Sequence, residues 1–276
     1  MKYLCTGGTG FLGVELIKRL KERGFDDLVV VSRNEGKLVE LQERYGVKII
    51  PGDIADSYTC DKAMQGVEGV YHLAAFKFVG LAETNVKTCV ESNVIGTLNL
   101  LEATRIYKPR FMVGVSTDKA THVNGVYGAT KMLQERLFKD YEGINPYTKY
   151  RTVRYGNVLY STGSVLCKWK DKLQRGEEIV LTDPDATRFY WTVDQAVNLI
   201  FECLEKAQDS TPFVTPMKAM RVGDLLDAMI ERYAVGTPHV RTIGLQPGEN
   251  MHEQIVEGQD SSMVERFTKK EILELI

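Results

Sequence analysis

Near the start of the chain stands Thr6-Gly7-Gly8-Thr9-Gly10-Phe11-Leu12-Gly13, after a short apolar stretch and before a helical pattern. Gly7, Gly10 and Gly13 occupy the positions at which a pyrophosphate-binding loop needs glycine, for a tight turn, close approach of phosphates and close packing of helix on strand. The following helix N-terminus would offer free N–H groups and a positive dipole end. An ordinary strand-to-helix turn is the alternative, but the flanking strand and helix favour a dinucleotide site.

The first half of the chain alternates short β-rich stretches with longer helical patterns. This rhythm predicts an α/β fold, a Rossmann-type doubly wound parallel sheet with helices on both faces and a smaller C-terminal substrate lobe. The expected helices span residues 11–23, about 85–107 and 126–141. The expected strands span residues 3–6, 28–32, 47–50, 70–73, 111–116 and 152–155.

The second expected strand ends at Val31-Ser32-Arg33-Asn34. Proteins that prefer NAD usually place an acidic residue here to bind the ribose hydroxyls, whereas Arg33 offers a planar guanidinium that suits a 2′-phosphate. These residues therefore favour NADP over NAD, with an exposed arginine at a strand end as the alternative. Two later loops, Gly52-Asp53-Ile54 and His72-Leu73-Ala74-Ala75, are expected beside the adenine and the nicotinamide.

The length of 276 residues allows a nucleotide-binding domain and a smaller lobe. We expect residues 1–155 to form an NADP-binding Rossmann domain and residues 156–276 to form mainly the substrate-binding lobe, with some segments returning to the first domain. Beyond residue 155 the elements become shorter, with glycines and prolines between them. The charged tail, residues 265–274, is expected to form a solvated helix.

Composition argues against several classes of partner. Lys and Arg number 35 against 37 Asp and Glu, a formal charge of -2, so no global field attracts nucleic acid or an anionic membrane. The chain enters its glycine loop without room for a signal peptide and has no apolar stretch of transmembrane length, so we expect a cytoplasmic protein. The five cysteines and four histidines are scattered, which indicates neither a disulfide framework nor a metal site.

Tyr127 and Lys131 are four residues apart at the start of a helical pattern, so their side chains share one face. A nearby ammonium lowers the pKa of a tyrosine from about 10, and the phenolate then accepts a hydroxyl proton while hydride moves to a nicotinamide. Lys131 can also hold the nicotinamide ribose. A half-buried aromatic beside a snorkelling lysine is the alternative, but the position after a glycine loop and a fifth strand favours catalysis.

Ser116-Thr117-Asp118-Lys119 ends the fifth expected strand, at the sheet edge where ligands bind. If a sugar C4 hydroxyl is first oxidised to a ketone, the neighbouring C5 hydrogen becomes acidic. Lys119 can then remove that proton while Asp118 protonates the departing C6 hydroxyl, after which hydride returns to C6. A solvent-exposed ion pair at a strand end is the alternative.

Taken together, these residues resemble the extended short-chain dehydrogenases, and among them the inverting UDP-N-acetylglucosamine 4,6-dehydratases of bacterial surface-sugar pathways. The resemblance covers nearly the whole chain. Its most diagnostic motif is Thr117-Asp118-Lys119, because retaining relatives carry Asp-Glu there. The other matching motifs lie at residues 6–13, 52–54, 72–77, 93–97, 127–131, 154–158, 187–189, 247–249 and 252–253.

This resemblance implies a lyase that acts on UDP-N-acetylglucosamine or a close UDP-hexosamine, inverts C5 and recycles a tightly bound NADP. Relatives form dimers through two long helices, which implies a homo-oligomer. The implied catalytic residues are Thr117, Asp118, Lys119, Tyr127 and Lys131. The implied substrate contacts are Lys77, Thr117, Asn157, Arg188 and Glu249. The implied cofactor contacts are Gly7, Thr9, Gly10, Phe11, Leu12, Gly13, Ser32, Arg33, Asn34, Asp53, Ile54, Leu73, Ala74, Ala75, Lys77, Asn93, Tyr127, Lys131 and Tyr155.

Five positions depart from the family pattern where the substrate is expected. Val123 and Gly125 stand where relatives usually carry proline and asparagine. Thr162 and Gln246 replace arginines, and Asn250 replaces a lysine. Losing two guanidinium groups weakens the expected grip on a diphosphate, so a differently substituted hexosamine nucleotide remains open.

Two other functions fit part of the pattern. A UDP-sugar 4-epimerase shares the fold, the glycine loop, Tyr127 and Lys131, but it needs no acid–base pair for C5 and C6. A non-catalytic NADP-binding sensor could keep the loop and lose the chemistry. The presence of Asp118 and Lys119 favours the dehydratase.

Overall fold

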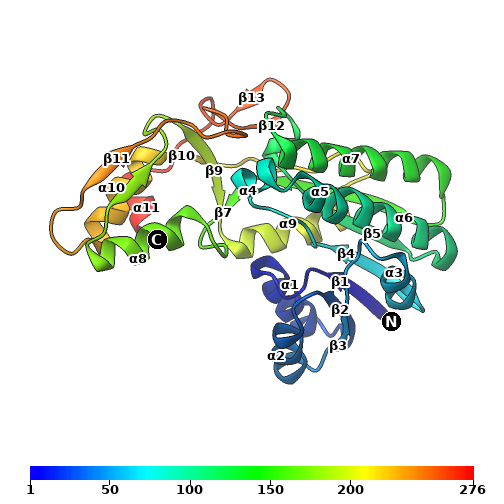
Figure 1. The fold of residues 1–276 in the computed structure, drawn as a ribbon. Helices are drawn as coiled ribbons and strands as arrows, with labels where there is room; N and C mark the ends of the chain where they lie inside the picture. Colours follow the sequence, from blue (N-terminus) through cyan, green and yellow to red (C-terminus); the bar gives the residue numbers. More distant parts are fainter.

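One parallel sheet forms the centre of the larger part of the molecule, seen on the right of Figure 1. The computed structural model describes residues 1–276. Six strands pair in parallel in the order β3-β2-β1-β4-β5-β6, which confirms the expected Rossmann-type sheet with its topological switch between β1 and β4. The bounds are β1 Lys2–Thr6, β2 Asp27–Ser32, β3 Lys48–Pro51, β4 Val67–His72, β5 Phe111–Thr117 and β6 Lys149–Tyr155.

Helices cover both faces of this sheet, because successive side chains of a strand point to opposite faces and both sets are apolar. Tyr3 and Cys5 of β1 belong to the core under α1, α2 and α9, whereas Leu4 belongs to the core under α3, α6 and α7. Thus α9 returns from the second half of the chain to cover the sheet. The bounds are α1 Phe11–Glu22, α2 Glu35–Tyr45, α3 Ser57–Met64, α6 Gly96–Tyr107, α7 Val126–Ile144 and α9 Val193–Lys206.

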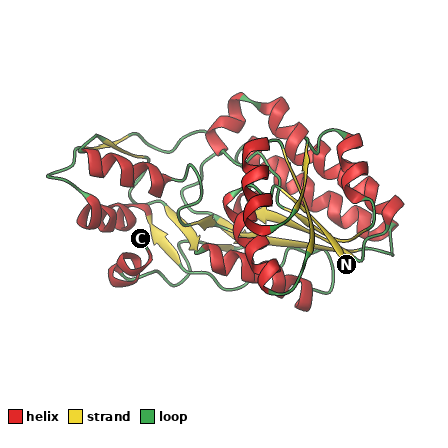
Figure 2. Ribbon diagram, turned by 90° about the horizontal axis from the view of Figure 1, so that it is seen from below, coloured by secondary structure: helices red, strands yellow, loops and turns green.

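A smaller lobe extends away from the sheet, as Figures 1 and 2 show. Its own core includes Trp169, Tyr190 and Leu225. Two of its strands form the β12–β13 hairpin, which lies close to the short 3-10 turn Asp118–Ala120 after β5. The bounds are β7 Asn157–Val158, α8 Val165–Arg175, β8 Ile179–Leu181, β9 Thr187–Trp191, β10 Ala219–Arg221, α10 Val222–Tyr233, β11 Val240–Thr242, β12 Gln254–Val256, β13 Gln259–Asp260 and α11 Lys269–Leu275.

The long helix expected over residues 85–107 is interrupted. Its parts are α5 (Val86–Val90), a π-helical turn (Glu91–Ile95) and α6, and a further helix, α4 (Val79–Thr84), precedes them. The expectation of a solvated helix in the tail is corrected by α11, because Ile272 is fully buried where α11 packs on α10. None of the helices combines the length and apolar character needed to cross a bilayer.

Candidate active site

A cleft of about 650 Å³ opens at the carboxyl ends of the sheet strands, and the glycine loop forms one wall. Gly7 has a φ of 71°, and a Cβ there would lie 2.6 Å from the Ala74 backbone nitrogen. A Cβ on Gly13 would lie 2.5 Å from the carbonyl oxygen of Gly7. Helix α1 begins after Gly10 without a side-chain cap and without an acidic residue in its first turn. This wall therefore fits a pyrophosphate, which needs backbone approach and free N–H groups.

Most residues expected to contact the cofactor do line this cleft. The hydroxyl groups of Thr9 and Ser32 form a hydrogen bond, with their oxygens 2.6 Å apart. The Arg33 side chain is 58% exposed and reaches Asp53 at 3.5 Å, so its guanidinium remains available to a ligand at the end of β2. The lining residues from the expected set are Gly7, Thr9, Gly10, Phe11, Leu12, Gly13, Ser32, Arg33, Asp53, Ile54, Leu73, Ala74, Ala75, Lys77, Tyr127, Lys131 and Tyr155.

Two residues of the expected cofactor set do not line the cleft. The side chain of Asn34 accepts a hydrogen bond from the Lys37 backbone nitrogen and caps α2. Asn93 is fully buried, accepts from the Phe76 backbone nitrogen at 2.7 Å and donates to the Phe76 carbonyl oxygen at 3.0 Å. Asn93 therefore shapes the loop after β4 from behind, where it has no surface to offer a cofactor.

Tyr127 and Lys131 both face the cleft from the first turns of α7. Burial raises the pKa of Tyr127 to about 12, and the charge that most opposes this shift is that of Lys119. Burial also lowers the pKa of Lys131 to about 8, with Glu135 opposing. The Lys131 amine donates to the Val115 carbonyl oxygen at 2.5 Å and to the Gln134 side chain. In this arrangement Lys119 is the larger charge acting on the phenol, and the Lys131 amine is hydrogen-bonded to β5 and to its own helix.

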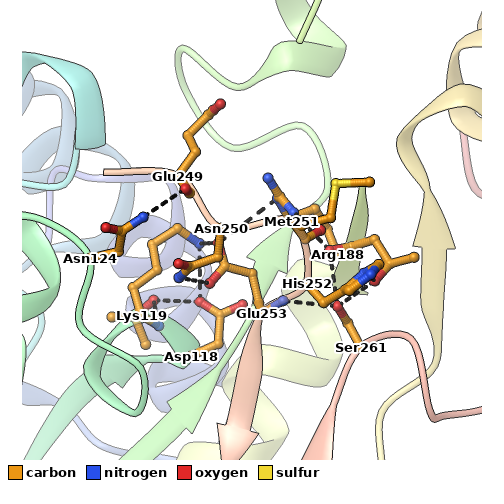
Figure 3. Close-up of polar contacts among 12 residues, drawn as sticks. Asp118, Lys119, Asn124, Arg188, Glu249, Asn250, Met251, His252, Glu253 and Ser261 are labelled. Atoms are coloured by element: carbon orange, nitrogen blue, oxygen red, sulfur yellow. Dashed lines mark hydrogen bonds and ion pairs between the residues drawn. The ribbon is translucent and has the colours of Figure 1, made fainter. Parts of the chain in front are cut away.

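Lys119 lies between two buried carboxylates, as Figure 3 shows. Its Nζ is 3.1 Å from Asp118 Oδ1 and 3.1 Å from Glu253 Oε1, and the side chains of Asp118 and Glu253 are 0% and 1% exposed. Thr117 donates its hydroxyl to Asp118 Oδ1 at 2.9 Å. The alternative of a solvent-exposed ion pair at a strand end is therefore wrong.

The ionisation of this cluster is strongly perturbed. Burial and the neighbouring Glu253 raise the pKa of Asp118, against the opposing charge of Lys119. Burial opposes the charge of Lys119, but the two carboxylates outweigh it and raise the pKa of the ammonium. Burial likewise opposes ionisation of Glu253, while Lys119 and Arg188 lower its pKa overall. The resting state thus holds a protonated lysine beside an acid that accepts a proton more readily than a free aspartate does.

A second cavity of about 290 Å³ continues from the cleft and shares Lys77, Lys119 and Asn157 with it. Arg188 and Glu249 also line this cavity, so it brings together four of the five expected substrate residues, while Thr117 lines the cleft. The Arg188 guanidinium donates to the carbonyl oxygens of Thr187 and Met251 at 2.8 and 3.0 Å. Its orientation is therefore fixed before any ligand arrives.

A protein-family model described as polysaccharide biosynthesis protein matches residues 3–274 of the chain. The chain belongs to this family. A protein of Methanocaldococcus jannaschii, named as an uncharacterized membrane protein, is 35% identical over 92% of this chain and 79% of its own length. An inverting UDP-N-acetylglucosamine 4,6-dehydratase of Campylobacter jejuni is 31% identical over 96% of this chain and 80% of its own.

Epimerases are also among the relatives of this family member. A UDP-glucose 4-epimerase of Rickettsia canadensis is 30% identical over 95% of this chain and 79% of its own. Among solved structures, Pen from Bacillus thuringiensis is 28% identical, covers 100% of this chain and 96% of its own, and superposes with a TM-score of 0.94. The relatives support an enzyme of the nucleotide-sugar dehydratase and epimerase class.

Of the five positions that depart from the family pattern, Thr162 is the one that lines the second cavity. The Thr162 carbonyl oxygen accepts from Lys77 Nζ at 2.9 Å. Asn250 donates its amide to Glu253 Oε2 at 3.2 Å. Gln246 bonds within its own loop through Gly244. Thr162, Gln246 and Asn250 therefore make only local contacts, where relatives carry the longer side chains of arginine or lysine. The remaining two are Val123, which is exposed, and Gly125, which precedes α7.

Two residues that the sequence did not single out are central to this site. In the sequence Glu253 belongs only to the motif His252-Glu253, and nothing in that motif indicates that Glu253 contacts Lys119. Glu83 of α4 accepts from the Val126 backbone nitrogen at 2.8 Å and thereby caps the helix that carries Tyr127. Both contacts join segments far apart in the chain, so spacing alone could not find them.

Proposed function

We propose that the protein is an NADP-dependent nucleotide-sugar 4,6-dehydratase, a lyase that acts on UDP-N-acetylglucosamine or a close UDP-hexosamine and inverts C5. The observation that carries the proposal is the buried Asp118–Lys119 pair, in which Lys119 Nζ and Asp118 Oδ1 are 3.1 Å apart. Lys119 lines the cleft together with Tyr127, whereas Asp118 is 0% exposed and is not part of the lining. A 4-epimerase of this fold needs Tyr127 but has no step that uses such a pair.

Each residue has one task in this proposal. A bound nicotinamide dinucleotide supplies an acceptor for hydride from C4 and its donor back to C6. Tyr127 takes the proton of the C4 hydroxyl, and the Lys119 charge and the Thr117 side chain are the contributions of this chain that lower the tyrosine pKa against the effect of burial. Lys119 removes the C5 proton, and Asp118 protonates the C6 hydroxyl as it leaves as water. Once hydride has returned to C6, a proton must be delivered to the opposite face of C5, which completes the product and inverts that carbon.

This assignment requires that Lys119 first loses its own proton. The 3.1 Å contact between Lys119 Nζ and Asp118 Oδ1 offers the route, because transfer along it turns the ion pair into a neutral amine and a neutral acid. The raised pKa of Asp118 favours that transfer, whereas the raised pKa of Lys119 opposes it, so the neutral pair forms at the moment of reaction and not in the resting state. Both groups then hold the protonation state that elimination needs.

Mass spectrometry of the product separates dehydration from epimerisation. Incubation of the protein with UDP-N-acetylglucosamine is expected to give a nucleotide sugar lighter by one water, whereas an isobaric product would support the epimerase. Lys119→Ala is expected to lose the release of water while hydrogen exchange at C4 persists at a lower rate, because the Lys119 charge also assists Tyr127. Turnover by the unmodified chain also excludes a non-catalytic sensor.

For the cofactor we propose tightly bound NADP, on the strength of Arg33 at the end of β2 and the absence of an acidic side chain at that position in Val31-Ser32-Arg33-Asn34. Denaturing the purified protein and identifying the released nucleotide by mass is the test. NADP is expected in near-stoichiometric amount, and Arg33→Ala is expected to shift the retained nucleotide toward NAD. Release of NAD alone from the unmodified chain would overturn this part.

A further inference from the structure

Glu253 reaches the Asp118–Lys119 pair from a distant part of the chain and is held there rigidly. Its backbone nitrogen donates to Ser261 Oγ at 3.0 Å, and Ser261 Oγ donates to the Thr187 carbonyl oxygen at 2.9 Å. Its Oε2 accepts from the Asn250 amide at 3.2 Å. These contacts, drawn in Figure 3, fix the carboxylate on the β9 side of Lys119.

Two carboxylate oxygens of the cluster have unused hydrogen-bonding capacity. Glu253 Oε1 meets Lys119 Nζ as an ion pair at 3.1 Å but accepts no hydrogen bond of good geometry. Asp118 Oδ2 has no partner and faces Gly156 in the cleft wall, where a Cβ would lie 3.1 Å from it. A buried acceptor without a donor is costly. The arrangement thus leaves Asp118 Oδ2 without a donor, behind Gly156 of the cleft wall, while Glu253 holds Lys119 from the other side.

We propose that Glu253 is a positioning residue of the Asp118–Lys119 pair. Its carboxylate holds Lys119 against Asp118, and its negative charge sets the pH range in which Asp118 and Lys119 share a single proton. The second part rests on the proposed dehydration. The first part does not, because it concerns the orientation and charge of Lys119 alone.

The sign of the effect follows from the charges that face Lys119. The charged neighbours are Asp118 beside it, Glu253 before β12 and Arg188 on β9. Tyr127 and Tyr190 also lie nearby as neutral phenols. Two carboxylates and two cations balance, so removal of the Glu253 charge leaves the cluster net positive. A more positive cluster lowers the pKa of both Asp118 and the Lys119 ammonium, whichever of the two carries the shared proton. Both limbs of a bell-shaped rate profile therefore move to lower pH.

The test compares pH profiles of kcat/KM for water loss in the unmodified full chain, Glu253→Gln and Glu253→Asp. Glu253→Gln is expected to shift both limbs downward by about one pH unit or more, and Glu253→Asp, which keeps the charge, is expected to restore the original limbs. Glu257→Gln is the matched control, because it removes the same charge from the exposed turn of the same hairpin and is expected to leave the profile unchanged. A uniform fall in rate without a shift would overturn the proposal.

A second measurement keeps the proposal testable if the chain does not dehydrate the sugar. The Cε resonance of carbon-13-labelled Lys119, assigned through Lys119→Arg, reports its protonation directly. In the unmodified chain it is expected to remain protonated through the alkaline range in which the fold persists, whereas in Glu253→Gln it is expected to titrate within that range. An unchanged Lys119 titration in a folded Glu253→Gln variant would reject the role of Glu253, while a missing water loss alone would reject only the proposed function.

Discussion

At the scale of single residues, Lys131 shows how the site opposes the stability of the fold. Its side chain is buried, and burial lowers its pKa from 10.5 to about 8. An isolated buried ammonium is costly, and only Glu135 provides an opposing charge of note. The hydrogen bonds to Val115 and Gln134 orient the amine without neutralising it. Burial alone would favour an apolar side chain at this position over a lysine.

Replacement of Lys131 by Met is therefore expected to stabilise the nucleotide-free protein near neutral pH by about 1 to 3 kcal/mol, and to abolish activity. The folded pKa lies below the unfolded value, so the cost of the charge is complete below pH about 8 and disappears above 10.5. The gain should accordingly vanish as the pH rises through that range. Urea unfolding at several pH values measures it, with the exposed Lys87→Met as control. A variant that is less stable at every pH would contradict this.

At the scale of elements, the N-terminus of α7 depends on a neighbouring helix. Gly125 precedes α7 and provides no side-chain cap, and Glu83 of α4 accepts from the Val126 nitrogen at 2.8 Å instead. A Cβ on Gly125 would lie 2.5 Å from Glu83 Oε1, so the departure from the family's asparagine leaves room for this acidic cap. A carboxylate at this position also interacts favourably with the helix dipole. Since Tyr127 is the next residue, α4 determines where the phenol stands.

Loss of this cap is expected to affect both stability and rate. Glu83→Ala should lower the free energy of unfolding by about 1 kcal/mol and reduce kcat severalfold, because the first turn of α7 frays beside Tyr127. Glu83→Gln keeps an acceptor and should recover most of both. Glu91→Ala removes an acidic residue from an exposed pair with Lys87 and serves as control in thermal melts and rate assays. Equal effects of Glu83→Ala and Glu91→Ala would argue against a specific cap.

At the scale of the whole molecule, a buried ion pair joins the sheet, α7 and the C-terminal hairpin. Arg154 of β6 donates from two nitrogens to Glu135 of α7, at 3.0 and 2.6 Å. Its Nη1 donates to the Ile255 carbonyl oxygen at 2.8 Å, two residues after Glu253. The side chains of Arg154 and Glu135 are 11% and 9% exposed. One guanidinium thus connects three segments whose relative placement defines the acid–base cluster.

Breaking this connection on one side is expected to be expensive. Arg154→Met should destabilise the protein by about 3 to 5 kcal/mol, because it leaves Glu135 buried without its partner. The double variant with Glu135→Met should lose much less than the sum of the two single losses, as expected for partners that share one interaction. Urea unfolding of the four proteins measures the difference. Additive losses would mean that the two residues act independently.

The sequence predicts well what short segments determine by themselves. Leu16, Ile17 and Leu20 recur at helical spacing and are fully buried in α1, and the cleft residues follow directly after their strands. Contacts between distant segments escape such reasoning, and Glu253 is the main example. The π-helical turn that buries Asn93, like the burial that raises the pKa of Tyr127, depends on the assembled fold. No pattern of residue types along the chain specifies either of them.

The position of Glu253 also has a consequence for synthesis of the chain. Every strand of the main sheet, and α9 that covers one face, emerges from the ribosome before Glu253 does. A nascent chain can therefore complete the nucleotide-binding loop while Lys119 still lacks its second carboxylate. A stalled or truncated product that ends before Glu253 would carry that loop but lack the second carboxylate beside Lys119. The acid–base cluster is therefore the last part of the site to be completed.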